Sequence, residues 1–196
     1  MRGKFIRQHA EAALHLVARA EQRPPSVTIV LAEQVLRELS DHLAAVGAEA
    51  ERAIARLNSA LEVCDAYGVL SGVPNPLVTA NSFSTAAGTI IQRIRRSAIH
   101  LKGSAASRNL AYLRVIDARA PAATGKQSMK DCVIIENYFQ LIKASRMAGF
   151  TQNALFLTSN TADYQKGSTP HPDLVGDFRG MGLEFTTNWE QARFSI

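Results

Sequence analysis

The sequence of 196 residues lacks the features that mark disulfide-stapled or membrane-bound proteins. Its two cysteines, Cys64 and Cys132, are too few for a secreted disulfide framework, so we expect free thiols in a reducing cytoplasm. The longest wholly apolar stretches are a few residues, whereas a membrane span needs about 20. Residues 1–4 lead into no signal-peptide core. We therefore expect neither membrane insertion nor export.

The common cofactor and catalytic motifs are also missing. Neither Gly-x-Gly-x-x-Gly nor a P-loop pattern is present, so the sequence has none of the usual motifs for binding a dinucleotide or a nucleoside triphosphate. The five histidines are scattered, so their spacing indicates no zinc site. No Ser-His or Cys-His pairing stands out for nucleophilic catalysis. The chain is long enough to bury a full core as one domain.

Positive charge is concentrated in one segment. Residues 91–130 contain nine Lys and Arg and a single acid, Asp117, a local charge of +8. The whole chain carries +5, so the remainder carries −3. A basic segment on a mildly acidic body is typical of a polyanion-binding surface, but a solvated helix face would have the same composition. Charge alone leaves both interpretations open.

Hydrophobic periodicity predicts helices and strands in alternation. Expected helices cover residues 4–21, 32–43, 48–67, 85–101, 131–148 and 188–194, and expected strands cover residues 27–31, 154–158 and 183–187. Residues 104–120 are ambiguous. In the first helix the apolar face is expected to be Ile6, Ala10, Ala13, Leu14 and Val17, and in the fifth Val133, Ile134, Tyr138, Leu141 and Ile142. Alternation of this kind favours an α/β fold with a mainly parallel central sheet covered on both faces. We expect one domain over 1–196 with a largely helical middle section at about 45–105.

Three carboxylates are candidates for a site at the carboxyl ends of the strands. Asp163 follows the strand at 154–158, Glu38 lies on the helix after the strand at 27–31, and Asp131 opens a later helix beside a basic loop. Carboxylates without His or Cys neighbours suit Mg²⁺ or Mn²⁺, which promote phosphodiester hydrolysis. Each acid also has a purely structural interpretation: Asp131 as a helix cap, Glu38 as a solvated helix residue and Asp163 as a turn residue. Glu136 is about 140° around the helix from Asp131 and should not share its face.

Several segments together resemble PIN-like nuclease domains. The resemblance is carried by residues 119–121, 125–126 and 130–136, by Leu155 to Tyr164, and by the strand and helix at 27–43. It covers roughly residues 25–45 and 115–190. The resemblance implies a three-layer α/β/α sandwich that binds Mg²⁺ or Mn²⁺ through acidic residues and cleaves RNA.

The family's acidic residues are carried over by position. Glu38 would match the acid on the family's helix, and Asp131 the acid that opens the later helix. The third match is either Asp163 directly or the neutral oxygens of Asn160 and Thr161. Basic side chains beside this site would hold RNA: Arg93, Arg95, Arg96, Arg119, Lys126 and Lys130.

One departure from the family is more serious. PIN-like domains begin with a hydrophobic strand that ends in an Asp central to the metal site, and nothing before residue 25 has that pattern; the first acid is Glu11. Loss of one of about four carboxylates would weaken coordination of the cation. We therefore expect reduced or absent nuclease activity from this chain.

Two main hypotheses follow from the resemblance. The first is a metal-dependent endoribonuclease, of the kind that acts as the toxin of a toxin–antitoxin pair or in RNA processing, with RNA and an antitoxin protein as partners. The second is a catalytically inactive module that binds RNA or protein. A weaker third is an interaction domain whose charges only maintain solubility, and a homodimer is compatible with any of them.

Overall fold

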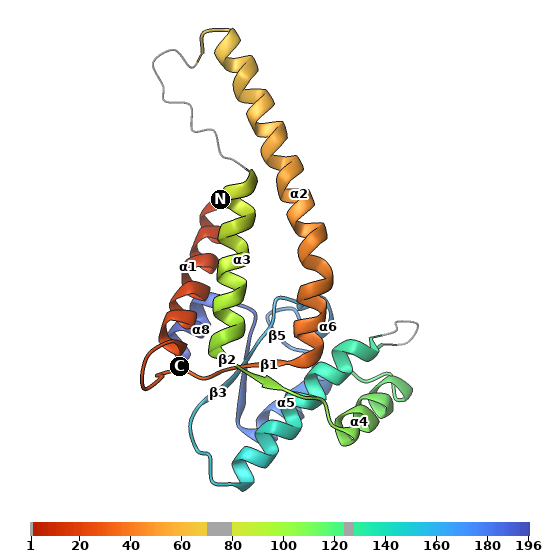
Figure 1. Ribbon diagram of the computed structural model, residues 1–196. Helices are drawn as coiled ribbons and strands as arrows, with labels where there is room; N and C mark the ends of the chain where they lie inside the picture. The colour runs from red at the N-terminus through yellow and green to blue at the C-terminus, as the bar shows by residue number, and fades with distance from the viewer. Residues whose placement is uncertain (1, 70–79, 124–127) are drawn as a thin grey trace. The chain divides into compact units, whose positions relative to one another are not determined.

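The computed structural model describes residues 2–69, 80–123 and 128–196 (Figure 1). The chain is mixed α/β and 66% helical, with short parallel strand pairs, so the α/β class is confirmed. The elements, in chain order, are α1 (Arg2–Ala20), β1 (Ile29–Ala32), α2 (Glu33–Ala66), α3 (Ala80–Ser97), β2 (Ala98–Leu101), α4 (Ala105–Ile116), α5 (Met129–Met147), β3 (Ala154–Leu157), α6 (Thr161–Tyr164), β4 (Gln165–Lys166), β5 (Thr169–Pro170), α7 (Pro172–Met181), β6 (Leu183–Thr186) and α8 (Trp189–Ser195). Across the described ranges, no helix is long and apolar enough to cross a membrane.

The chain divides into two compact units. Met1–Val35 and Ser97–Ile196 form one, called here the strand unit, and Leu36–Arg96 form the other, called the helical unit. The strand unit contains every strand, whereas the helical unit consists of most of α2 and α3. The helical section expected at about 45–105 overlaps the helical unit.

The strands of the strand unit form separate pairs. β1 pairs in parallel with β2, with Ile29 opposite Ala98, and β3 pairs in parallel with β6, with Ala154 opposite Leu183. A two-residue antiparallel pair joins β4 and β5. Each pair has its own hydrogen-bonded ladder, so the described strands do not join into the single central sheet that the sequence predicts. The parallel direction of the longer pairs is as predicted.

Two element boundaries differ from the sequence prediction. The helix expected to reach Leu101 ends at Ser97, and Ala98–Leu101 form β2, because tertiary pairing with β1 overrides the helical pattern. The helices expected at 32–43 and 48–67 are one continuous helix, α2, because Gly47 weakens a helix without breaking it and no proline interrupts the run. The ambiguous stretch contains α4, whose first turn is capped by the Ser104 side chain.

The core of the strand unit is aromatic and centred on α5. Phe156 of β3 lies in ring contact with Tyr164 (centroids 5.4 Å apart), Tyr138 (5.6 Å) and Phe178 (5.8 Å), and buried Ile135 packs in the same cluster. The Tyr138 hydroxyl also accepts a hydrogen bond from the Ala32 amide (2.9 Å). These contacts fix α5 against both longer strand pairs.

The faces expected for α1 and α5 are only partly right. Side-chain burial in α1 is described from residue 8 onward: Ala12, Leu16, Val17 and Ala20 are buried, the predicted Ala13 and Leu14 are half-buried and Ala10 is exposed, whereas Ile6 lies outside the described side chains. In α5 the buried residues are Cys132, Ile134, Ile135, Glu136, Asn137 and Phe139, and the predicted Val133, Tyr138 and Ile142 are half-buried and pack against the core. Contacts on several sides bury α5, so a one-sided periodicity does not describe it.

Candidate functional site

Three residues predicted from the sequence meet at the carboxyl end of β3. The Asn160 Nδ2 donates to Asp131 Oδ1 at 3.2 Å and to Asp163 Oδ2 at 2.9 Å. Asp131 lies in the first turn of α5, and Asn160 and Asp163 lie at and after the start of α6. All three side chains are half-buried. We call this group the acidic cluster.

The backbone around the acidic cluster is held by buried groups. The Tyr164 hydroxyl donates to the Asp131 carbonyl at 3.0 Å, and Tyr164 is only 2% exposed. The Tyr164 carbonyl in turn accepts from the His171 amide at 2.8 Å. The Asn160 amide donates to Thr158 Oγ1 at 3.1 Å, and Thr158 continues the pairing of β3 with β6. The cluster is therefore preorganised by the fold.

The donor chemistry of the acidic cluster is purely oxygen and amide. Two carboxylates and an amide carbonyl are hard ligands, which Mg²⁺ and Mn²⁺ prefer and which leave positions for water. Among the residues that the structure describes, no group of three or more His, Cys, Asp or Glu could hold a metal ion. The cluster thus offers two carboxylates, fewer than the resemblance implies.

The remaining acidic candidate, Glu38, lies on α2 in the helical unit and is half-buried. The acidic cluster lies in the strand unit, so Glu38 is not one of its members. Thr161, the alternative oxygen donor, is exposed at the first position of α6.

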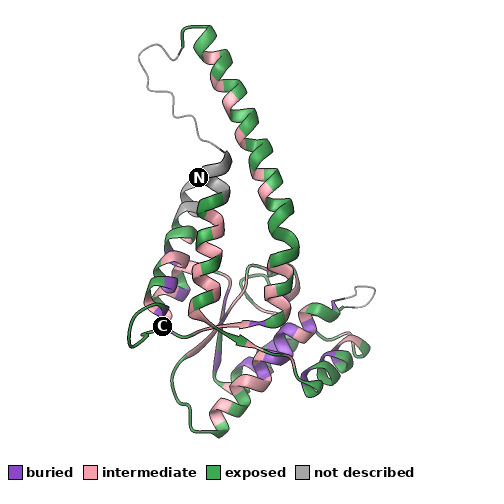
Figure 2. Cartoon of the chain, viewed as in Figure 1, coloured by how far each residue is buried: buried purple, intermediate pink, exposed green. Residues whose placement is uncertain are grey.

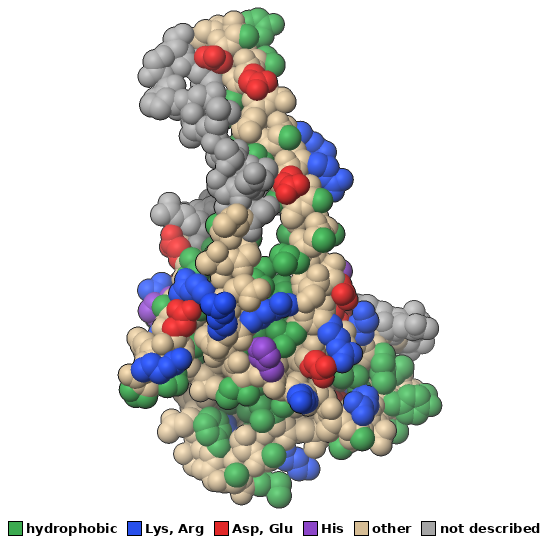
Figure 3. Space-filling model, viewed as in Figure 1, with side chains coloured by type: hydrophobic (Ala, Val, Ile, Leu, Met, Phe, Trp, Pro, Cys, Tyr) green, Lys and Arg blue, Asp and Glu red, His purple; other side chains and the backbone are tan. Residues whose placement is uncertain are grey.

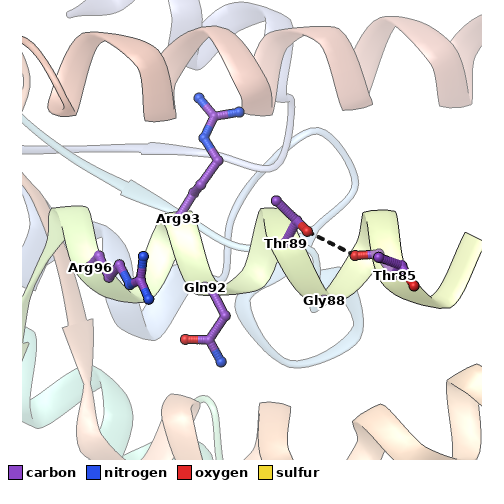
Figure 4. A pocket seen from close by; sticks show the side chains of 6 residues that line it. All are labelled: Thr85, Gly88, Thr89, Gln92, Arg93 and Arg96. Carbon is purple, nitrogen blue, oxygen red and sulfur yellow. Dashed lines mark hydrogen bonds between the residues drawn. The ribbon is translucent and has the colours of Figure 1, made fainter.

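The predicted RNA-binding residues of α3 differ in their surroundings. Arg95 donates to Ser40 Oγ at 2.6 Å and so ties α3 to α2. Arg93 and Arg96 line a shallow hollow on one face of α3 with four other residues of the helix (Figure 4): Thr85, Gly88, Thr89 and Gln92. Every residue that lines it belongs to α3.

Two more of these basic residues, Lys130 and Arg119, lie in the strand unit. Lys130 is exposed in the first turn of α5, directly before Asp131. Arg119 is half-exposed and lies 3.7 Å from Asp177. Lys126 lies outside the described residues. Lys130 and Arg119 are the basic side chains of the strand unit on which the RNA hypothesis rests.

Arg114 occupies a role that the sequence did not reveal. It is 5% exposed and donates through Nε to Glu136, through Nη2 to Asp177 at 2.6 Å and through Nη1 to the Ala120 carbonyl at 3.0 Å. Burial opposes its charge, but the hydrogen bonds to Asp177 and Glu136 outweigh this and raise the pKa of the guanidinium. We call these residues the Arg114 cluster.

The Arg114 cluster changes how the basic segment is interpreted. Of the nine Lys and Arg side chains in residues 91–130, Arg114 is buried and paired with Glu136 and Asp177. The surface available to a polyanion is therefore less basic than the local charge of +8 suggests. Glu136, correctly separated from Asp131 by the helical geometry, is paired with Arg114 rather than exposed at a site. No spacing in the sequence links Arg114 to Asp177, which lie 63 positions apart.

Cys132 is fully buried on α5. Burial raises the pKa of its thiol to about 11, despite hydrogen bonding to the Ala122 backbone and the nearby Arg114 charge, which both lower it. The thiolate is therefore scarce at neutral pH.

Comparison with protein-family models, curated proteins and solved structures finds no match to this chain.

Proposed function

We propose that the chain is a PIN-like, metal-dependent ribonuclease with an α/β/α arrangement and weak activity. The observation that supports it is the convergence of Asp131 and Asp163 on one amide group at the carboxyl end of a parallel strand. The carboxyl ends of parallel strands are where α/β folds bind ligands.

A divalent cation fits this donor set. The Asn160 amide places hydrogens, the positive end of its dipole, against one oxygen of each carboxylate. The neutral amide of Asn160 joins the two carboxylates but does not cancel their negative charge. A cation bound by the same oxygens would cancel it. If the amide rotates, its carbonyl becomes a third ligand. Mg²⁺ sites in proteins commonly use one or two carboxylates and retain several waters.

The chemistry assigned to each group follows from this arrangement. Bound Mg²⁺ or Mn²⁺ would supply an activated water and charge neutralisation at the phosphate. Asp131 and Asp163 hold the cation, Asn160 orients them, and Lys130 and Arg119 contact phosphates of the RNA. With two carboxylates instead of about four, the cluster holds less negative charge, so we expect weak binding of the cation and slow cleavage.

An RNA-binding module without catalysis is the second candidate. It is favoured by the absence of a third carboxylate from the acidic cluster within the described ranges. In that case Lys130 and Arg119 would bind RNA with an affinity that falls steeply as the salt concentration rises.

The experiment is a titration with Mn²⁺ that follows the thermal midpoint of the full chain, combined with cleavage of single-stranded RNA. Mn²⁺ should raise the midpoint of the unmodified chain, and Asp131→Asn or Asp163→Asn should abolish the increase. Asp117→Asn, which removes an exposed carboxylate at the end of α4, is the matched control and should retain it.

The outcomes separate the two candidates. Slow cleavage that needs Mn²⁺ and both aspartates supports the nuclease. RNA binding that Lys130→Ala weakens, with no response to Mn²⁺, supports the module and contradicts the metal site. Lys143→Ala removes an exposed cation about 20 Å further along α5 and is the control for the binding measurement.

A further inference from the structure

The helix α2 is the longest element of the chain and is not buried anywhere. It spans 34 residues, all of them described, and none is buried (Figure 2). A helix of this length usually buries one face in its own domain, because tertiary packing supplies most of its stability. Figure 3 shows hydrophobic side chains at intervals along its exposed surface.

A narrow apolar stripe runs along α2. It is centred on Ala50, and four larger apolar residues precede Ala50 and four follow it. With 100° per residue, all nine positions fall within about 80° of the helix circumference. Such a narrow stripe is the pattern of a coiled-coil seam rather than of a helix that lies on a broad core. We call it the α2 seam.

The α2 seam is symmetric in sequence about Ala50. The residues before it lie 4, 7, 11 and 14 positions away, and so do the residues after it. At 4 positions the two residues are Val46 and Ile54, and at 7 positions they are Leu43 and Leu57. The sizes of the paired side chains match as well as their positions.

The outer pairs continue the symmetry. At 11 positions the residues are Leu39 and Leu61, and at 14 they are Leu36 and Cys64. A regular heptad repeat is symmetric only about the midpoint between two seam positions; the two consecutive spacings of four place the centre of the α2 seam on a residue, Ala50. Spacings of that kind also locally unwind a left-handed supercoil.

The other helix of the helical unit is too short to cover this seam. Arg95, near the end of α3, donates to the Leu36 carbonyl (3.5 Å) and to Ser40, so α3 meets α2 near the start of α2. The 18 residues of α3 span about 27 Å, whereas the seam spans about 42 Å. Figure 1 shows α2 continuing well past α3.

The exposure of the seam side chains agrees with this. Leu43 is 40% exposed, Val46 58% and Leu57 51%. The other six seam residues, including Ala50 and Ile54, are half-buried, so the seam is partly covered along its length and fully buried at none of its positions.

We propose that α2 pairs with α2 of a second copy of this chain, antiparallel, with the two-fold axis at Ala50. In that register Leu43 of each copy packs against Leu57 of the other, and Val46 against Ile54. A two-fold interface requires a surface that is complementary to itself, and an antiparallel helix pair requires its seam to be the same in both directions. A different partner protein would need no such symmetry.

The size of the interface is consistent with a reversible dimer. A contact strip about 42 Å long and roughly 10 Å wide on each helix would cover about 800 Å² in total. This is below the roughly 1,200 Å² at which stable specific interfaces begin, so the pairing proposed here is a weak, transient one. Small side chains at the centre favour close approach: Ala50 lies on the axis, and Ala53 and Ala60 flank the same side of the seam.

Sedimentation of the full chain over a range of concentrations tests the proposal. The unmodified chain should show a reversible dimer, and Leu43→Glu with Leu57→Glu should raise the dissociation constant by about a hundredfold or more, because charges would be buried in the seam. The matched control, Ala55→Glu with Val63→Glu, adds the same charge at exposed apolar positions about 140° around the helix from the seam centre and should leave the dimer intact. Circular dichroism checks that both variants keep their helix content.

Disulfide trapping tests the register. In a Cys64→Ala background, Leu43→Cys combined with Leu57→Cys should give a covalent dimer on mild oxidation, because the two positions face each other across the pair. Leu43→Cys alone should not, because the two copies of residue 43 would lie about 21 Å apart along the helices. A chain that stays monomeric at all concentrations, or a dimer that Leu43→Cys alone traps, would overturn the proposal.

Discussion

The two long helices α5 and α2 are stabilised in different ways. α5 has 19 residues and buries six of them, including the charged Glu136, whereas α2 has 34 residues and buries none. α5 is surrounded by β1, α4 and α7 and is fixed by tertiary contacts. α2 depends on local helix energy and, in our proposal, on a second copy. The comparison shows that helical periodicity in the sequence does not distinguish these two situations.

Two acidic residues of α5 also differ in how their charge is accommodated within the strand unit. Glu136 of α5 is neutralised by the buried guanidinium of Arg114 and has a structural role. Asp131, five residues earlier on the same helix, is bridged to Asp163 by a neutral amide. The first arrangement pairs opposite charges, whereas in the second the two carboxylates are joined by a neutral group.

The largest effect is expected where α5 depends on buried charge. Arg114→Met should lower the free energy of unfolding by about 3–5 kcal/mol, because it leaves Glu136 buried without its cation and frees the Ala120 carbonyl. Urea unfolding followed by circular dichroism measures the loss. Arg119→Met removes a half-exposed cation from the same Asp177 and should cost less than about 1 kcal/mol. Equal losses for the two variants would mean that the Arg114 cluster is not the structural centre described here.

The Arg114 cluster illustrates why part of the fold escaped prediction. The strands at 29–32, 154–157 and 183–186 were foreseen, since short β-branched or apolar runs between polar turns have few alternatives. β2 was not, because Ala98–Leu101 follow a helix without a break and become a strand only through pairing with β1. Burial of Arg114 depends on partners 22 and 63 positions away, and no local pattern encodes such contacts.

Core packing should give the next largest contrast between the helices. Ile135→Ala removes a fully buried side chain of α5 and should cost about 2–5 kcal/mol of stability. Val63→Ala, on an exposed face of α2, should change the stability by less than about 0.5 kcal/mol. The same urea titration measures both. A loss of more than 1 kcal/mol for Val63→Ala would show that α2 is packed against something that the described contacts omit.

The two cysteines, one on α5 and one on α2, should differ in their rates of alkylation. Cys132 of α5 has a pKa of about 11 instead of 9.0 and is fully buried, so at pH 8 its thiolate is about a hundredfold scarcer than that of an ordinary thiol. Iodoacetamide should therefore label Cys64 of α2 first, giving one modification in the native chain and two in denaturant, as counted by mass spectrometry.

The raised pKa of Cys132 also makes the free energy of unfolding depend on pH. Because the folded-state pKa of Cys132 is raised, the stabilising contribution of its neutral thiol is complete below about pH 8.5 and is lost as the pH rises through about 11. Cys132→Ala should flatten the alkaline part of the stability curve. Rapid labelling of Cys132 at pH 8 would contradict its burial.

The acidic cluster was more predictable than its environment. Asp131, Asp163 and Glu38 were the carboxylates expected at one edge of the fold, with Asn160 as an alternative oxygen ligand. The structure joins Asp131 and Asp163 through Asn160, whereas Glu38 lies in the helical unit. Tyr164 donates a hydrogen bond to the Asp131 carbonyl. It belongs to the segment that resembles PIN-like domains, but the sequence does not indicate that it positions Asp131. A fully buried tyrosine directly after the cluster is a packing feature, and its hydroxyl partner is visible only in three dimensions.

The smallest effect is expected in α2 and tests whether its stability is local. Gly47→Ala should stabilise the helix by about 0.5–1 kcal/mol, because alanine loses less backbone freedom and its Cβ would have no atom within 4 Å. Gly167→Ala, also with open space but at a φ of +64°, should be destabilising by about 1–2 kcal/mol, since only the backbone conformation distinguishes the two sites. Hydrogen exchange of the α2 amides, resolved by peptide, should slow about two- to fivefold in Gly47→Ala and remain unchanged in Gly167→Ala. Unchanged exchange in Gly47→Ala would mean that α2 opens only with the whole chain, as α5 should, and the contrast between the helices would fail.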